Sequence, residues 1–258
     1  MAGIGFPITS EVTDDETWWV ERFINMAHIL MVVTAADSLT LADGTEHATG
    51  FWAEELVVAH RDLAQAGHTV RVATPGGLRP TVDPGSLSVQ IVGDHGQIDE
   101  FVAYLASIDG ELATPLALDE VVVADYEAIV LPGGHGPMAD LATDAALGAI
   151  LSAANDAGIL IAPFCHGPAG LLSAVDSEGA FAFAGRRLTV FTDEEERAGG
   201  LGENAPWLVA SVLSERGAII EYGTAWSSHV VRDGNLISGQ NPQSSAAVAV
   251  ELIAALGE

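Results

Sequence analysis

Short apolar runs alternate with amphipathic stretches through most of this chain. Four runs are almost continuously apolar and are bounded by Gly or Pro: 27–36, 67–75, 126–134 and 157–164. Such runs are typical of parallel strands that are buried on both faces of a sheet. The stretches between them, 50–67 and 138–158, predict helices that each end at a glycine. The alternation predicts an α/β fold with a doubly wound, mostly parallel sheet and helices on both faces.

The last third of the chain continues the alternation with shorter elements. The pattern predicts, in order, a strand at 186–192, a helix at 205–216, a strand at 217–223, a hairpin at 229–239 and a closing helix at 242–256. Asp233 and Gly234 form a favourable two-residue turn, so we place the hairpin's loop there.

No linker, repeat or low-complexity segment divides the chain. We expect residues 1–25 to be an acidic N-terminal extension and residues 26–258 to form a single α/β domain. Residues 85–120 interrupt the strand–helix alternation, so we expect them to form a small inserted lid or subdomain.

The charge balance excludes some partners. The 258 residues include 36 acidic and 9 basic side chains, for a net charge of −27, and contain no lysine. Such a surface should repel nucleic acid and anionic membranes. It also stays hydrated where salt screens repulsion, so we hypothesise adaptation to high salt.

We expect a cytoplasmic, globular protein. Hydrophobic residues make up 49% of the chain, yet no apolar run reaches the roughly 18–20 residues that cross a membrane. The N-terminus lacks the basic start and apolar block of a signal peptide. The single cysteine allows no disulfide within one chain, which fits a reducing compartment.

That cysteine, Cys165, lies in "LIAPFCHGPAGLL", directly after a predicted strand. Ligands of doubly wound folds bind at the carboxyl ends of strands. A strand, a nucleophile, small residues and then a helix form the pattern of a nucleophile elbow. The amides and dipole of the helix N-terminus would favour the thiolate. A core filler is the plainer reading of a lone cysteine, but this position favours a nucleophile.

A second glycine-rich turn, "LPGGHGPMADL" at 131–141, follows another predicted strand. Its backbone amides could form an oxyanion hole, although a simple tight turn explains the glycines equally well. We assign His135 within it a structural or turn role, because no second histidine or acid lies at metal-ligand spacing in the sequence. We expect neither a metal nor another cofactor.

Taken together, "LPGGHGPMADL", "APFCHGPAGLL", "FTDEEE" and "GNLISGQNPQSS" resemble the DJ-1/PfpI superfamily, which is related to class I glutamine amidotransferase domains. More narrowly, they resemble its heat-shock chaperone and glutathione-independent glyoxalase III branch. The likeness runs from about residue 27 to the C-terminus. It implies a flavodoxin-like, class I glutamine amidotransferase-like fold.

The resemblance also implies roles for particular residues. Cys165 would be the nucleophile, His166 its base, and Glu196 the acid that orients the histidine. Read without the resemblance, "DEEE" is a solvated charged loop. Glu55 from the first long helix would reach the cysteine, although periodicity alone does not separate it from Glu54. The oxyanion hole would be formed by residues of the two turns: Gly133, Gly134 and His166.

The implied reaction converts methylglyoxal or a related 2-oxoaldehyde to a 2-hydroxy acid, D-lactate, through a Cys165 hemithioacetal. A cysteine peptidase or amidase would use the same groups, and a non-enzymatic holding chaperone is a further alternative within this branch. Glutamine amidotransfer is weaker, because the late His-x-Glu pair is missing: His229 is followed by Val230 and Val231.

Three further residues are candidates for the pocket: His47, Phe164 and Trp226. Phe164 stands where the branch commonly has a smaller aliphatic residue, so it could reshape the site. A solvated loop position is the plainer reading for His47, and core packing is the plainer reading for Trp226. Relatives commonly form dimers, which keeps a homodimer as an open alternative, whereas a charge of −27 opposes association at low salt.

Overall fold

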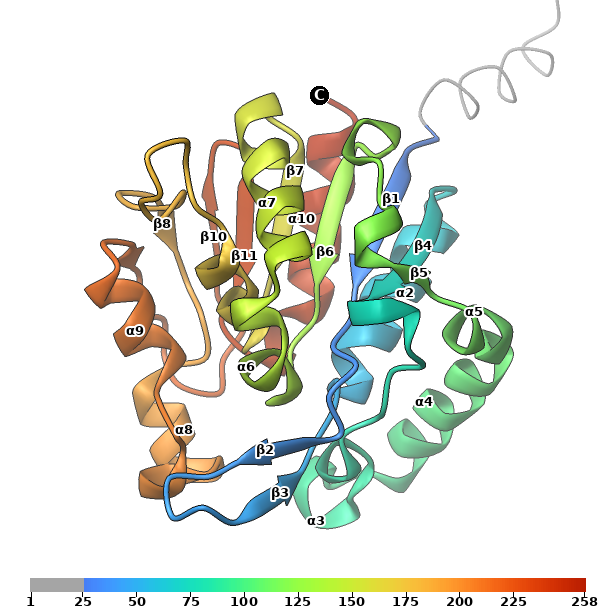
Figure 1. Cartoon of the computed structure of the whole chain (residues 1–258). Coiled ribbons are helices and arrows are strands. Elements are labelled where there is room, and N and C mark those ends of the chain that lie inside the picture. Colours follow the sequence, from blue (N-terminus) through green and yellow to red (C-terminus); the bar gives the residue numbers. More distant parts are fainter. Residues whose placement is uncertain (1–25) are drawn as a thin grey trace, which may run out of the picture.

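The computed structural model describes residues 26–258, and a seven-stranded sheet forms its centre (Figure 1). The strand order is β10-β11-β7-β6-β1-β4-β5. The strands are β1 (His28–Val32), β4 (Thr69–Thr74), β5 (Leu116–Ala117), β6 (Ala128–Leu131), β7 (Leu160–Pro163), β10 (Val230–Asp233) and β11 (Leu236–Gly239). Adjacent strands are parallel except β10 and β11, which are antiparallel. The predicted mostly parallel sheet is therefore confirmed.

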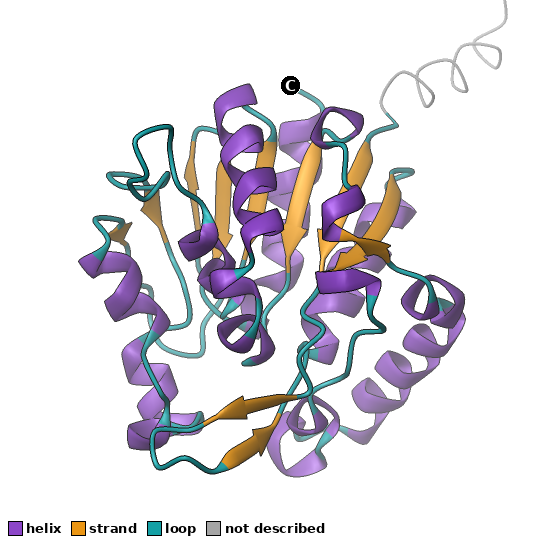
Figure 2. Cartoon of the chain, in the orientation of Figure 1, coloured by secondary structure: helices purple, strands orange, loops and turns teal. Residues whose placement is uncertain are grey.

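Helices cover both faces of this sheet, as Figure 2 shows. Along β1, Ile29 and Met31 pack with α2 (Ala53–Gln65) and α10 (Ser245–Leu256) in one apolar cluster. Leu30 packs in a second cluster with α7 (Ala145–Ala157) and α9 (Val209–Glu215). Neighbouring side chains of a strand point to opposite faces, so a continuously apolar strand needs two covered faces.

The expected helix at 138–158 is broken, so that prediction was wrong in its extent. The segment is α6 (Gly136–Ala139), a 3₁₀ turn at Leu141–Thr143, and then α7. The side chain of Asp140 accepts hydrogen bonds from the Thr34 hydroxyl and from the amides of Ala35 and Ala36, just beyond β1. Asp140, at the break, therefore connects the segment after β6 to the end of β1.

The last third of the chain differs from the prediction in two details. The strands expected at 186–192 and 217–223 are only β8 (Arg187–Leu188) and β9 (Ile219–Ile220), which pair apart from the main sheet. In the hairpin, Asp233 pairs with Leu236, so the loop is Gly234-Asn235 rather than Asp233-Gly234. Gly234 has φ +59°, a conformation that glycine adopts without a steric penalty.

Residues 85–120 are mainly helical and pack beside α2 (Figure 1). They include part of a 3₁₀ turn (Pro84–Leu87), α3 (Val89–Val92), α4 (His95–Ser107) and α5 (Asp109–Ala113). Buried His60 of α2 lies 2.9 Å from the Tyr104 hydroxyl and 3.2 Å from Glu111 Oε2. These contacts join this segment to α2, and β5 within it belongs to the central sheet. That the segment forms an inserted lid or subdomain stays a prediction.

Two further elements complete the arrangement near the strand ends. A hairpin of β2 (Ser38–Thr40) and β3 (Glu46–Ala48) lies on one side, and α8 (Asp193–Gly199) on another (Figure 1). The expected N-terminal extension, 1–25, lies outside the described residues. Within 26–258, no helix has the length and apolar character to cross a membrane.

Candidate active site

Cys165 lies at the carboxyl end of β7 in a strained conformation. Its φ is +56°, which is unusual for a residue other than glycine. Two backbone hydrogen bonds hold this turn: Cys165 N–H donates to Gly239 O at 2.9 Å, and Phe191 N–H donates to Cys165 O at 2.9 Å. The side chain is almost fully buried. The strain and the position are those of a nucleophile elbow.

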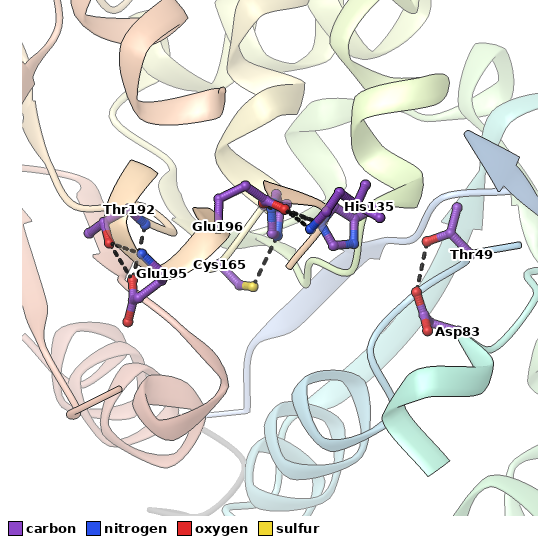
Figure 3. A network of polar contacts seen from close by, with 9 residues as sticks. Thr49, Asp83, His135, Cys165, Thr192, Glu195 and Glu196 are labelled. Atoms are coloured by element: carbon purple, nitrogen blue, oxygen red, sulfur yellow. Dashed lines mark hydrogen bonds and ion pairs between the residues drawn. The ribbon is translucent and has the colours of Figure 1, made fainter. Parts of the chain in front are cut away.

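His166 and Glu196 extend from the sulfur as a chain of polar contacts, and Figure 3 labels the two ends of this chain, Cys165 and Glu196. Cys165 Sγ is 3.3 Å from His166 Nδ1, and His166 Nε2 is 2.7 Å from Glu196 Oε2. Burial disfavours the Glu196 carboxylate, yet hydrogen bonds from two imidazoles hold its pKa well below the usual range. An ionised Glu196 accepts a hydrogen bond from His166 Nε2–H, so Nδ1 presents its lone pair to the sulfur.

Glu196 is in helix α8 and not in the solvated loop that the residues alone had indicated. Thr192 caps this helix: its hydroxyl accepts from Glu195 N–H, and Glu195 Oε2 accepts from Thr192 N–H. This capping box turns Glu196 inward, where it is buried. The Thr-x-x-Glu spacing in "FTDEEE" is the sequence pattern that indicates such a helix start.

His135 lies in the turn before α6, and its side chain also reaches the site. Its Nε2 lies 3.0 and 3.2 Å from the two oxygens of Glu196. Its ring is tilted over His166, with 4.3 Å between the ring centroids. Burial and then the charge of His135 lower the pKa of His166, against the opposing effect of Glu196. A lone histidine in a glycine turn gave no sign of this partner, because Glu196 is 61 residues away.

Glu55 is fully buried beside the cysteine, whereas Glu54 lines the open pocket. Glu55 Oε2 accepts a hydrogen bond from Gly133 N–H at 2.6 Å, and Oε1 has no hydrogen-bond partner. Burial raises the Glu55 pKa to about 8, opposed by contacts with Cys165 and Gly133. Burial also raises the pKa of the Cys165 thiol, and the nearby Glu55 carboxylate adds to the rise. The two groups therefore compete for charge, and a neutral Glu55 favours the thiolate.

The helix expected after Cys165 is a 3₁₀ helix and not an α-helix. Residues Gly167–Ser173 form a 3₁₀ helix of seven residues, so the helix dipole is smaller than predicted. Amides near the sulfur act instead: the N–H groups of Gly134 and His166 donate to it and oppose the rise in its pKa. Gly133 was expected to join them, but its N–H is bonded to Glu55, so that expectation was wrong.

These groups open into a pocket of about 370 Å³, within the usual range for small ligands. Trp226 lines this pocket, as predicted from the sequence. The lining is largely apolar and consists of Trp52, Glu54, Ile91, Val92, Gln97, Gly134, His135, Cys165, His166, Phe191, Gly199, Gly200, Trp226, Pro242 and Gln243. Ile91, Val92 and Gln97 come from the segment 85–120. This segment therefore supplies part of the pocket wall.

The other two pocket candidates lie elsewhere. Phe164 is fully buried in the apolar cluster of α2 and α10 and does not line the pocket, so this prediction was wrong. Alternation along the chain directs it away from the site, because its neighbour Cys165 faces the pocket. His47 also does not line the pocket, but its ring meets His135 edge-on at 6.1 Å.

Glu195 is a second residue that the sequence reasoning had missed. It is fully buried, and its Oε1 accepts from Trp226 N–H at 2.7 Å, Asn241 Nδ2 at 2.8 Å and Gln240 Nε2 at 3.2 Å. Trp226 has φ +59°, a costly conformation for a bulky residue. Glu195 thus fixes the loop that brings Trp226 into the pocket.

In a comparison with known protein families, residues 46–255 match the model of the DJ-1/PfpI family. The chain belongs to the DJ-1/PfpI family. The predicted superfamily is therefore confirmed. A curated relative, the protein/nucleic acid deglycase HchA of Staphylococcus aureus, is 24% identical over 225 residues, which are 84% of this chain and 75% of that protein.

Solved structures agree with this family membership. The rapid encystment protein of Francisella tularensis is 27% identical, with a TM-score of 0.78 over 90% of this chain and 99% of that one. A crystallographic structure whose name states no function is 37% identical, with a TM-score of 0.77 over 90% and 98%. Glyoxalase III from Candida albicans is 23% identical, with a TM-score of 0.76 over 90% and 98%, and it shares the fold.

Proposed function

We propose that this protein is a glutathione-independent, glyoxalase III-like enzyme that converts methylglyoxal or a related 2-oxoaldehyde to a 2-hydroxy acid. The observation that carries the proposal is the placement of two separate proton-carrying groups beside one buried thiol. His166 Nδ1 lies 3.3 Å from the sulfur. The Glu55 carboxyl also contacts the thiol, and its charge raises the pKa of Cys165. Moving a proton between adjacent carbons and between their oxygens needs more than one such group.

The first step is addition of sulfur to the aldehyde. His166 Nδ1 takes the thiol proton, and the Cys165 thiolate adds to the aldehyde carbon. The carbonyl π electrons move to oxygen, next to the amides of Gly134 and His166 that donate toward the sulfur. Imidazolium returns the proton to this oxygen, which leaves a neutral hemithioacetal. Glu196 stabilises the transient positive charge on His166.

The second step is an isomerisation. His166 removes the hydrogen from the hemithioacetal carbon, and the electrons form a carbon–carbon double bond while the neighbouring ketone oxygen gains negative charge. Protonated Glu55 gives its proton to that oxygen and takes the one from the hemithioacetal hydroxyl. His166 then delivers its proton to the second carbon. The result is a 2-hydroxyacyl thioester on Cys165.

The third step is hydrolysis. Water adds to the thioester carbon with His166 as base, and the Cys165 thiolate leaves as the carbonyl re-forms. The sum is addition of one water to the 2-oxoaldehyde with no change in net oxidation state. For methylglyoxal the product is lactate, and the resemblance to the glyoxalase III branch gives the D enantiomer.

A second candidate is deglycation, removal of a 2-oxoaldehyde from an amine or thiol to which it is attached. Two observations favour it. The pocket is open to solvent past Trp226, which is 44% exposed, so a substrate larger than a three-carbon aldehyde can enter. The relative from Staphylococcus aureus carries the name of a protein/nucleic acid deglycase.

The test is lactate formation from methylglyoxal without glutathione, measured with D-lactate dehydrogenase, for wild type, Cys165→Ser and Glu55→Gln. We expect turnover by wild type, at least about 100-fold less with Glu55→Gln, and none with Cys165→Ser. A parallel assay supplies the methylglyoxal adduct of N-acetylcysteine together with an excess of a trap for free aldehyde. The rate at which the adduct is lost is measured. Release faster than spontaneous decay supports deglycation.

Failure has distinct forms. Wild type that makes no lactate, yet hydrolyses a peptide or amide with dependence on Cys165, is a peptidase or amidase. Protein that does neither but prevents aggregation of an unfolding client equally well as Cys165→Ser is a holding chaperone. Either result overturns the proposed enzyme.

A further inference from the structure

A second cluster of ligand-type side chains lies next to the triad. His47, Asp83 and His135 each offer one donor atom, and these atoms all lie within 4.8 Å of one another. They come from β3, the segment before the 3₁₀ turn at Pro84–Leu87, and the turn before α6. Two imidazoles and a carboxylate are a common ligand set for zinc and similar ions. We propose that these three residues bind a divalent transition-metal ion such as Zn²⁺.

His135 is already oriented as a metal-binding histidine would be. Its Nε2 contacts the carboxylate of Glu196, so Nδ1 is the nitrogen that would bind the ion. A carboxylate bonded to the far ring nitrogen fixes the tautomer and increases the basicity of the ligating nitrogen. Figure 3 shows His135 between Glu196 and Asp83, which is the order that this arrangement requires.

Asp83 is buried and held from two sides. Its Oδ2 accepts from the Thr49 hydroxyl at 2.8 Å, and its Oδ1 accepts from Gly85 N–H at 2.7 Å. Both donors are neutral, so the carboxylate has no basic partner in these contacts. A bound cation would supply the missing counter-charge.

His47 supplies the adjustable ligand. Donors bound at about 2.0–2.1 Å in a tetrahedron are roughly 3.3 Å apart, closer than the 4.8 Å limit of the unbound cluster. His47 is half-buried on the short β2–β3 hairpin and meets His135 edge-on. Rotation of this side chain closes the cluster without moving the sheet. The fourth position would be left to water or to a ligand from the pocket.

A second cluster, His135, His166 and Glu196, also has the composition of a metal site. An ion there would replace the 2.7 Å contact between His166 and Glu196 and occupy the lone pairs that orient the triad. Binding by His47, Asp83 and His135 leaves both contacts of Glu196 in place. The geometry therefore favours the cluster with His47, and it couples the ion to the triad through His135 and Glu196.

The experiment measures Zn²⁺ affinity by chelator competition and ligand geometry by Co²⁺ absorption on the full, metal-stripped chain. The variants are His47→Gln, Asp83→Asn, Cys165→Ser and the control His95→Gln, which changes an exposed histidine at the start of α4. We expect one equivalent bound by wild type, Cys165→Ser and His95→Gln. We expect His47→Gln to bind at least about tenfold more weakly. Circular dichroism checks that each variant is folded.

Three results overturn the proposal. One is the absence of stoichiometric binding by wild type. Another is unchanged affinity in His47→Gln, which places the ion at His135, His166 and Glu196. The third is loss of binding in Cys165→Ser together with a sulfur-to-cobalt charge-transfer band in wild type, which makes the thiolate the ligand. Because His47 is half-buried on a hairpin, His47→Gln remains informative if Asp83→Asn fails to fold.

Discussion

Cys165 and Glu55 form a buried pair in which a second negative charge is costly. Burial raises the pKa of both groups; the Glu55 charge raises the pKa of Cys165 further, whereas the contact with Cys165 opposes the rise in the Glu55 pKa. At neutral pH the Glu55 carboxyl, with a pKa raised to about 8, holds a proton that it can share with the sulfur. Two groups coupled in this way titrate as a pair, so the reactivity of the thiol depends on the glutamate.

Replacing Glu55 should change how stability depends on pH. Its pKa is about 8 when folded and near 4.5 when unfolded, so the folded state binds the extra proton between these values. That contribution is fully present below about pH 4.5 and is lost as pH rises through about 8. We expect wild type to lose on the order of 1 kcal/mol per pH unit relative to Glu55→Gln across this window. Urea unfolding at several pH values measures this, and parallel curves would contradict it.

Glu196 and its neighbour Glu194 provide a matched comparison within one helix. Glu196 contacts two imidazoles and is buried, whereas Glu194 is exposed. We expect Glu196→Gln to reduce kcat/KM for the 2-oxoaldehyde by about 100-fold or more, because His166 loses its fixed tautomer and counter-charge. Glu194→Gln should keep wild-type kcat/KM. Equal effects of the two changes would remove Glu196 from the proposed triad.

Helix α8 is short, yet it supplies two buried acids with different tasks. Glu196 points to the histidines, and Glu195 anchors Trp226 and Asn241. The capping box at Thr192 sets the rotation of this helix, so it controls both contacts at once. A seven-residue helix has little stability of its own and depends on such local bonds.

Removing the cap should therefore affect stability and catalysis together. We expect Thr192→Ala to lower the free energy of unfolding by about 1 kcal/mol, through loss of the hydroxyl bond to Glu195 N–H. Because α8 carries Glu196, kcat should fall as well. Thr192→Ser retains a hydroxyl and should restore most of both quantities. The measurements are urea unfolding and lactate formation, and a stability loss with unchanged kcat would show that the helix keeps its rotation without the cap.

The molecule as a whole carries far more negative than positive charge. With 36 acidic and 9 basic residues, most carboxylates cannot have an ion-pair partner. Their mutual repulsion destabilises the compact state until salt screens it. The ion pairs within the described residues use Arg and His and are mostly at the surface, where each contributes little.

Stability should consequently rise with salt. We expect the urea midpoint to increase from low ionic strength through about 1 M KCl, since the Debye length shortens from about 30 Å at 0.01 M to about 3 Å at 1 M. A further rise above that concentration would indicate adaptation to high salt beyond screening. A midpoint that stays flat or falls would contradict the hypothesis.

Much of the architecture could be predicted from local patterns. The runs around β1, β6 and β7 are apolar on both faces, and α2 shows a helical apolar periodicity, so each pattern identifies its element. Failures came where contacts between distant residues decide. Asp140 divides a predicted helix because it binds the end of β1, more than 100 residues earlier. The register of β10 against β11 moved the hairpin loop by one residue.

For the site, the order of residues along the chain marked Cys165 and its elbow, because a strand followed by small residues is a local signal. The partnership of His135 with Glu196, the loss of the Gly133 amide to Glu55, and the burial of Phe164 were decided in three dimensions. Each of these outcomes depends on which side chains the strand ends and α8 bring within about 3 Å of one another. Hydrogen bonds form only at such distances, and positions along the chain do not predict which distant residues reach them. Sequence therefore marked Cys165 as the candidate nucleophile and, through the resemblance, named His166, Glu55 and Glu196 as its partners; the tertiary structure brings these groups together and adds His135.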